Sequence, residues 1–258
     1  MGITRPYRRT CRQLVDGSYA NGGHGGYVTH PAYSESPEHY VRAFLVLQKD
    51  LQELFDYVEP SDQNLQCHSY RIRELLMRAC MEVEANCKAI LTENGAVLRE
   101  RSNMFDYRMV EQSHKLSAFQ VSVPTWHGAA AMRTPFVRWA NPPQDQNLPW
   151  YEAYNKTKHN RATNFHQATF ENMLDAVCAV VAILSAQFGD EDFSRNSNLL
   201  ALEGNQDGME TAIGGYFRVK FPTWPDDERY DFDWRSLKQA VDPFVNFPYA
   251  DTQELRRG

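Results

Sequence analysis

The sequence predicts a mainly α protein: a bundle of about four to six helices with a small β element inserted among them. Three observations point to this fold class. Apolar residues recur at helical spacing in three long segments, which begin near residues 37, 66 and 168. Short segments between and after them alternate apolar and polar residues, as strands do. The chain has 258 residues of which 42% are hydrophobic, enough for an ordinary core without disulfides.

The first long helix is predicted to begin at Pro37. Ser36 takes the N-cap position, Pro37 the first helical position, and Glu38 lies in the first turn. Apolar residues follow near 3.6-residue spacing as far as Val58, and Pro60 ends the helix.

A second helix is predicted over residues 66–93. Its apolar stripe consists of Ile72, Leu76, Ala79, Val83, Cys87 and Ile90. On other faces, opposite charges such as Glu84 and Lys88 lie four residues apart, which is ordinary for a solvated, salt-bridged surface.

Two short segments predict the β element. "KLSAFQVSVPTW" at 115–126 alternates Phe119, Val121 and Val123 with polar residues, and "YFRVKFPTW" at 216–224 repeats the pattern. The two strands either pair beside the helices or match only because Pro-Thr-Trp ends a strand in both. We expect a small element of roughly two or three strands, inserted between the second helix and residue 149.

The last long helix is predicted to begin around Ala168. It is apolar on nearly every side, which favours a position in the middle of the bundle. These elements predict three regions. An irregular arm (1–35), rich in Gly, Tyr and His, is expected to order against a protein partner; a helical domain with inserted strands (36–225) follows; an acidic C-terminal extension (226–258) contains a short helix near 234–241.

Composition excludes several classes of protein. A net charge of −6 argues against a protein that binds nucleic acid over its whole surface, but it does not exclude a local basic site.

Five cysteines without a CxxC pair indicate free thiols in a reducing, cytoplasmic compartment. No run is interpreted as long enough to span a bilayer, so no membrane is expected. No metal-ligand spacing or phosphate-binding Gly loop occurs, so we expect neither metal nor cofactor. The Trp residues are interpreted as core rather than as base-stacking platforms.

Candidate chemistry is concentrated in "WYEAYNKTKHNR" at 150–161. A helix starting at Pro149 would place Glu152, Asn155 and His159 on one face, with Lys158 and Arg161 beside them. A neutral imidazole can take the proton of a ribose 2′-hydroxyl, while the two cations hold the phosphate. This is the chemistry of metal-independent RNA cleavage. The simpler interpretation is a set of cations on a solvated helix face.

Two pieces of the chain resemble the HEPN superfamily (higher eukaryote and prokaryote nucleotide-binding): "YRIRELLMRACMEVEANCKAIL" at 70–91, and "WYEAYNKTKHNR" with the apolar helix after it. The resemblance covers the helical parts only. It implies a helical bundle of HEPN type, commonly a homodimer. Many members are ribonucleases of toxin and phage-defence systems, and others are inactive binding modules.

The resemblance also implies site residues. The family signature is an Arg, a polar residue, and a His five positions after the Arg. In one register Asn155 is the polar residue and His159 the histidine, but Tyr154 stands in place of the Arg, so Lys158 or Arg161 must contact phosphate. Glu84 would orient His159 or pair with Arg161, with Glu152 and Tyr154 in supporting positions.

A second register runs from Arg161 to His166, with Ala162 where the polar residue is expected. The leading hypothesis is therefore a metal-independent endoribonuclease that acts on RNA. The alternative is an inactive module that binds nucleotide, RNA or a protein partner, which Tyr154 favours. A weaker third possibility is a structural subunit whose arm docks on another chain.

Overall fold

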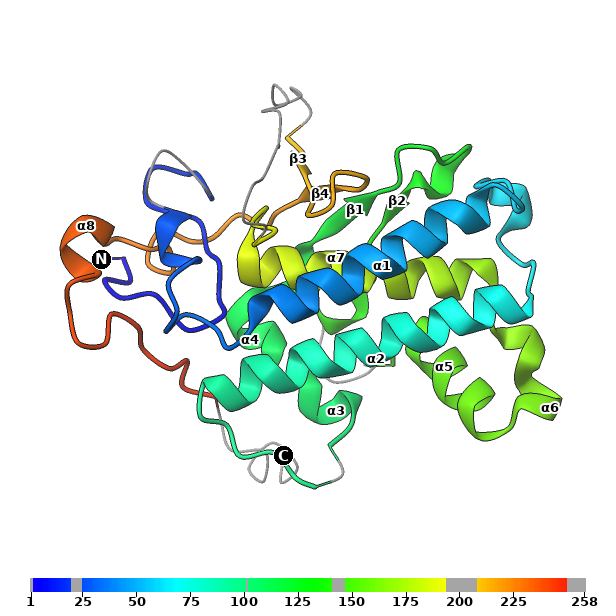
Figure 1. Cartoon of the computed structure of the whole chain (residues 1–258), viewed down its shortest axis with the longest axis horizontal. Helices are drawn as coiled ribbons and strands as arrows, with labels where there is room; N and C mark the ends of the chain where they lie inside the picture. Colours follow the sequence, from blue (N-terminus) through cyan, green and yellow to red (C-terminus); the bar gives the residue numbers. More distant parts are fainter. Residues whose placement is uncertain (1, 20–24, 101, 141–146, 194–207, 250–258) are drawn as a thin grey trace.

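The computed structural model describes residues 2–19, 25–100, 102–140, 147–193 and 208–249, and the protein is mainly α, as predicted. Three long helices, α1 (Pro37–Phe55), α2 (Tyr70–Glu93) and α7 (Phe170–Phe188), pack on one another, and α5 (Pro149–His159) packs against α2 and α7 (Figure 1). Residues 20–24 of the predicted arm and 250–258 of the predicted extension lie outside the described residues.

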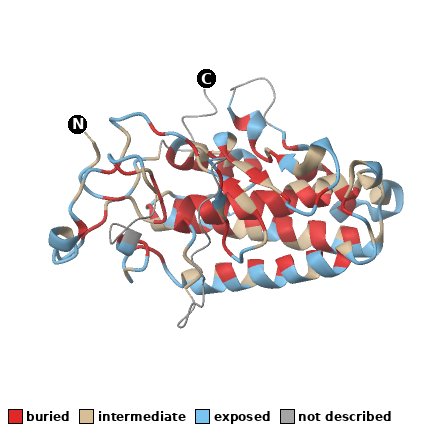
Figure 2. Ribbon diagram, turned by 90° about the horizontal axis from the view of Figure 1, so that it is seen from above, coloured by how far each residue is buried: buried red, intermediate tan, exposed pale blue. Residues whose placement is uncertain are grey.

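Helix α7 is the centre of the bundle. Nearly every side chain from Phe170 to Phe188 is buried, so it is red along almost its whole length in Figure 2. The sequence-based view that no segment could span a bilayer was wrong, because α7 is long and apolar enough to do so. Its burial inside the protein shows that its apolar character serves the core. The Thr169 hydroxyl accepts a hydrogen bond from Asn172 N and starts the helix slightly later than expected.

The ends of α1 and α2 differ in detail from the prediction. Ser36 precedes α1 with a left-handed φ of 46° and makes no side-chain cap hydrogen bond, although Pro37 does occupy the first turn. Helix α1 ends at Phe55, well before Pro60. Helix α2 begins at Tyr70, where the Ser69 hydroxyl accepts from Ile72 N at 3.2 Å.

The predicted apolar stripe of α2 is buried, comprising Ile72, Leu76, Ala79, Val83, Cys87 and Ile90. The charges on its other faces are used differently from the expected pattern. Arg78 pairs with Asp50 of α1, so this ion pair ties two helices together instead of decorating one.

The two predicted strands do pair. In a four-stranded antiparallel sheet ordered β2-β1-β4-β3, β1 (Gln120–Ser122) lies beside β4 (Arg218–Lys220), with Val121 opposite Val219. The remaining strands are β2 (Met132–Arg133) and β3 (Glu210–Thr211). The predicted position was wrong, because β3 and β4 follow α7 and the sheet is not one insertion before α5. It forms only when segments about a hundred residues apart come together.

Short helices complete the fold. They are α3 (Met104–Tyr107), α4 (Val110–His114), α6 (Arg161–Asn164) and α8 (Trp234–Leu237), with single 3-10 turns at Gly25–Tyr27, Asp62–Asn64, Leu116–Ala118, Ala129–Ala131, Val137–Trp139 and Phe165–Gln167. Helix α8 is shorter than the predicted 234–241 segment. All the tryptophans are buried, which confirms their interpretation as core: Trp126, Trp139, Trp150, Trp224 and Trp234. Cys80, Cys87 and Cys178 are buried as well.

The described N-terminal residues pack into the bundle and do not form a separate arm. Arg9 is fully buried; its Nε donates to Glu93 of α2 at 2.6 Å, and its Nη1 donates to Gln187 of α7 at 2.8 Å. The C-terminal extension joins them, since the Tyr230 hydroxyl donates to the Thr10 carbonyl at 2.7 Å. Tyr27 shares the same continuous core as α7. The predicted division into arm, helical domain and extension therefore does not describe the packing. The glycine-rich composition of the N-terminal segment suggested an irregular arm, but its described residues include buried aromatic and arginine side chains.

Candidate functional site

The helix that carries the candidate motif is fixed to α2 by aromatic and polar contacts. Tyr151 of α5 is nearly buried, and its hydroxyl donates to Glu84 Oε1 at 2.7 Å. Burial, together with this carboxylate, raises the pKa of Tyr151 above its usual value. Glu84 thus holds Tyr151, whereas we expected it to orient His159 or to pair with Arg161.

Tyr154, which stands where the resembled family has an arginine, is buried and faces the next turn of its own helix. Lys158 Nζ donates to the Tyr154 hydroxyl at 3.0 Å and lies 4.9 Å from the centre of its ring. This hydrogen bond raises the pKa of Lys158. Lys158 is therefore a cation of fixed position at the edge of the α2–α5 interface.

Positive side chains gather at the C-terminal end of α5. Lys156, Lys158 and His159 all lie in its last turn. Arg73 of α2 donates from Nη2 to the Thr157 carbonyl at 3.2 Å, and so supplies a partner for one of the last carbonyls of the helix. Cations complement the partial negative charge of a helix C-terminus, which gives this clustering a structural cause.

His159 and Arg161 stand on either side of a break in the helix. Helix α5 ends at His159, the chain turns at Asn160, and α6 starts at Arg161. Both side chains are exposed, and neither makes a hydrogen bond or ion pair with the part of the chain that the structure describes. The motif therefore lies at the end of one helix and the start of a short one, and not at the start of the long helix α7.

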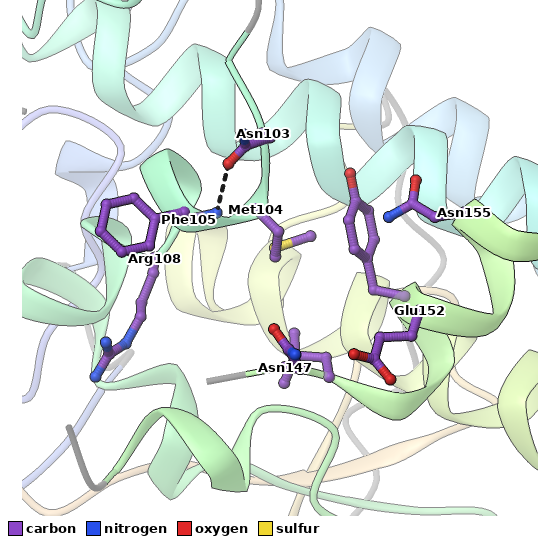
Figure 3. Close-up of a pocket in the computed structure, with 9 residues that line it drawn as sticks. Asn103, Met104, Phe105, Arg108, Asn147, Glu152 and Asn155 are labelled. Atoms are coloured by element: carbon purple, nitrogen blue, oxygen red, sulfur yellow. Dashed lines mark hydrogen bonds between the residues drawn. The ribbon is translucent and has the colours of Figure 1, made fainter. Parts of the chain in front are cut away.

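The other predicted site residues lie elsewhere. Glu152 and Asn155 line a cleft between α3 and α5, whose lining includes neither His159 nor Arg161 (Figure 3). His166, the histidine of the second register, borders a different shallow hollow, which it shares with Lys156 and Glu152. Asn155 thus lines a cleft whose lining does not include His159, although the two residues are one helical turn apart in sequence.

An aromatic pair lies next to the cationic helix end and was missed from the sequence. Tyr70, at the first turn of α2, is 66% exposed, and its ring centre lies 4.7 Å from that of Phe165. Tyr70 falls off the apolar stripe that begins at Ile72, and this offset was the available signal. We name the surface made by Tyr70, Arg73, Lys158, His159, Arg161 and Phe165 the basic end of the bundle.

Within the described ranges, no group of three or more His, Cys, Asp or Glu side chains is arranged to hold a metal ion. Comparison of the chain with protein-family models, curated proteins and solved structures gives no match.

Proposed function

We propose that the chain is a HEPN-like module that binds single-stranded RNA through the basic end of the bundle without cutting it. The observation that carries this proposal is the exposed ring of Tyr70, packed against the half-buried ring of Phe165, beside a cluster of cations. Grooves that bind single strands combine aromatic platforms, on which bases stack, with positive charge that follows the backbone.

The contacts of α2 bring the two components together. Tyr70 touches Phe165, four residues after Arg161, and Arg73 touches Thr157, two residues before His159. A base stacked on Tyr70 would therefore lie close to the start of α6, where the exposed Arg161 could contact its phosphate. The protein carries a net charge of −6, so this attraction would be confined to one end of the molecule.

Binding fits the site better than cleavage because no neighbour orients the imidazole. A general base needs a fixed ring and a stabilised phosphate. The His159 ring has no hydrogen-bond partner among the described residues, and Glu84 is held by Tyr151. In the register that contains His159, Tyr154 stands where the family signature has its arginine.

Cleavage is the second candidate, on one specific observation: His159 and Arg161 are both exposed and only one residue separates them. In this alternative a homodimer would act as a metal-independent endoribonuclease of toxin or phage-defence type. His159 would be the acid or base, Arg161 and Lys158 would bind phosphate, and the second chain would complete the site.

Fluorescence anisotropy with a labelled oligouridine of about 12 nucleotides tests binding. Tyr70→Ala should weaken affinity about 5- to 100-fold, the effect of losing one stacked base. Arg161→Ala should reduce the slope of log K against log salt by about 0.7. Met81→Ala, an exposed change three turns further along α2, is the matched control and should bind as the unmodified protein does. If Tyr70→Ala and Arg161→Ala bind the oligouridine as tightly as Met81→Ala does, the proposed surface is wrong.

Cleavage is tested on the same RNA in EDTA, with the His159→Ala variant alongside. Intact RNA with both proteins supports a binding module. Cutting that disappears with His159→Ala establishes the ribonuclease instead.

A further inference from the structure

A polar cleft between α3 and α5 lies apart from the basic end of the bundle. Its volume is about 380 Å³, which is within the range of small-molecule sites. The polar side chains that line it are Asn103, Arg108, Asn147, Glu152 and Asn155. Glu152 and Asn155 belong to the candidate motif, whereas Asn103, Arg108 and Asn147 come from outside it.

Most of these polar groups are available to a ligand. The side chains of Arg108, Asn147, Glu152 and Asn155 make no hydrogen bond to any residue that the structure describes. Asn103 uses its side-chain oxygen to accept from Phe105 N at 3.0 Å, which leaves its amide NH₂ as a donor.

The walls of the cleft are held in place. Asn103 N donates to Asp106 at 2.9 Å in a capping box, and Arg99 pairs with the same carboxylate at 2.5 Å, so the start of α3 is fixed. On the opposite wall, Tyr151 is fixed through its hydrogen bond to Glu84. A site formed in advance loses little freedom when a ligand enters.

The donors and acceptors that line the cleft are complementary in kind to those of guanine. Guanine has two adjacent donors, N1–H and the 2-amino group, which a carboxylate such as that of Glu152 can accept together. Its O6 and N7 are acceptors for amide NH₂ groups, which Asn155 and Asn147 supply. Adenine would turn the lone pair of N1 toward the carboxylate, and uracil offers only one N–H there. Phe105, 41% exposed, and the ring of Tyr151 add apolar surface for the faces of a base.

The cleft is polarised along its length. Figure 3 shows Arg108 and Phe105 at one end and Glu152 with Asn155 at the other. A base at the carboxylate end would direct its phosphate toward the guanidinium, the side chain suited to bidentate phosphate contact.

We propose that this cleft binds a guanine nucleotide, with the base on Glu152, Asn155 and Asn147 and the 5′-phosphate on Arg108. The inference stands independently of RNA binding at the basic end, because it uses other residues and a different face of α5.

Isothermal titration calorimetry of the full chain with GMP, AMP, UMP and guanosine tests the proposal. GMP should bind at least about tenfold more tightly than AMP or UMP. Glu152→Gln should abolish that preference, and Arg108→Ala should weaken GMP binding while leaving guanosine unchanged. Glu74→Gln, an exposed change on α2 outside the cleft, is the control. Thermal melts should show that each variant is folded.

The bound guanine could belong to an RNA or to a free nucleotide. A second titration, with oligouridine that carries one internal guanosine, distinguishes these two sources. A gain over plain oligouridine that depends on Glu152 assigns the cleft to RNA, and GMP binding without such a gain assigns it to the free nucleotide. The proposal fails if neither ligand binds, if AMP equals GMP, or if Glu152→Gln behaves as the unmodified protein.

Discussion

Lys158 Nζ donates a hydrogen bond of 3.0 Å to the hydroxyl of Tyr154, one turn earlier on α5. Tyr154 is buried against α2, so the bond fixes a cation at the edge of that interface. Tyr154 stands where the resembled signature has an arginine in the register that contains His159. It positions the lysine that remains.

Tyr154→Phe should release Lys158. The pKa of Lys158 should fall toward its ordinary value, because the hydrogen bond that raises it is lost. The free energy of unfolding should drop by about 0.5–1.5 kcal/mol. NMR titration of the lysine Cε signals measures the pKa, with exposed Lys156 as an internal control. An unchanged Lys158 pKa would contradict this account of the contact.

Arg9→Ala should strongly destabilise the fold. Arg9 is fully buried and donates to both Glu93 and Gln187, so its loss leaves a carboxylate without its partner. We expect a loss of about 3–5 kcal/mol in urea unfolding. Arg42→Ala, at an exposed position on α1, should change stability by less than about 0.5 kcal/mol. Equal stability of the two variants would mean that the N-terminal residues are not part of the core.

Gly128→Ala should destabilise the loop after β1 more than Gly17→Ala destabilises its own turn. Both glycines have positive φ, 129° and 89°, so each alanine is strained by about 1 kcal/mol. Only at Gly128 would the new Cβ meet the Asp62 carboxylate, which accepts hydrogen bonds from Trp126 Nε1 and Ala129 N at 2.7 Å each. The further loss should be about 1–3 kcal/mol in chemical unfolding. Similar losses at both sites would rule out the clash as the cause.

The stability of the protein should depend on His114 in mildly acidic solution. Burial lowers the pKa of His114 from 6.5 to about 3. Between those values the unfolded chain binds a proton that the folded protein does not, so stability falls as pH falls from 6.5 toward 3. One such proton steepens the slope by up to about 1.4 kcal/mol per pH unit. Urea unfolding across this window should show a shallower slope for His114→Gln, and parallel slopes would exclude His114 from the pH response.

Helical periodicity and apolar content were sufficient to predict the long helices and the central place of α7. Alternation in two short segments also predicted the strands β1 and β4, but it left open whether they pair. Both signals are local, since each residue's face depends on its neighbours along the chain. Helix ends were predicted less well: Ser36 occupies the cap position of α1 without capping it, because its backbone adopts a left-handed conformation.

The candidate site, too, was predicted only in part from the sequence. Its cations and histidine were visible in one short sequence, but their partners were not. Tyr70 and Arg73 reach the end of α5 from a different helix, and Asn155 faces α3 instead of His159.

What the sequence alone determined is the identity of the helices, the buried face of each, and the stretch where cations concentrate, because local spacing carries that information. The tertiary structure decided the rest: that the N- and C-terminal segments share one core, that Tyr154 holds Lys158 against α2, and that Glu152 and Asn155 belong to a separate cleft. These outcomes depend on contacts between residues far apart in the chain. Such residues meet only when the whole bundle packs, so local sequence spacing does not predict which of them pair.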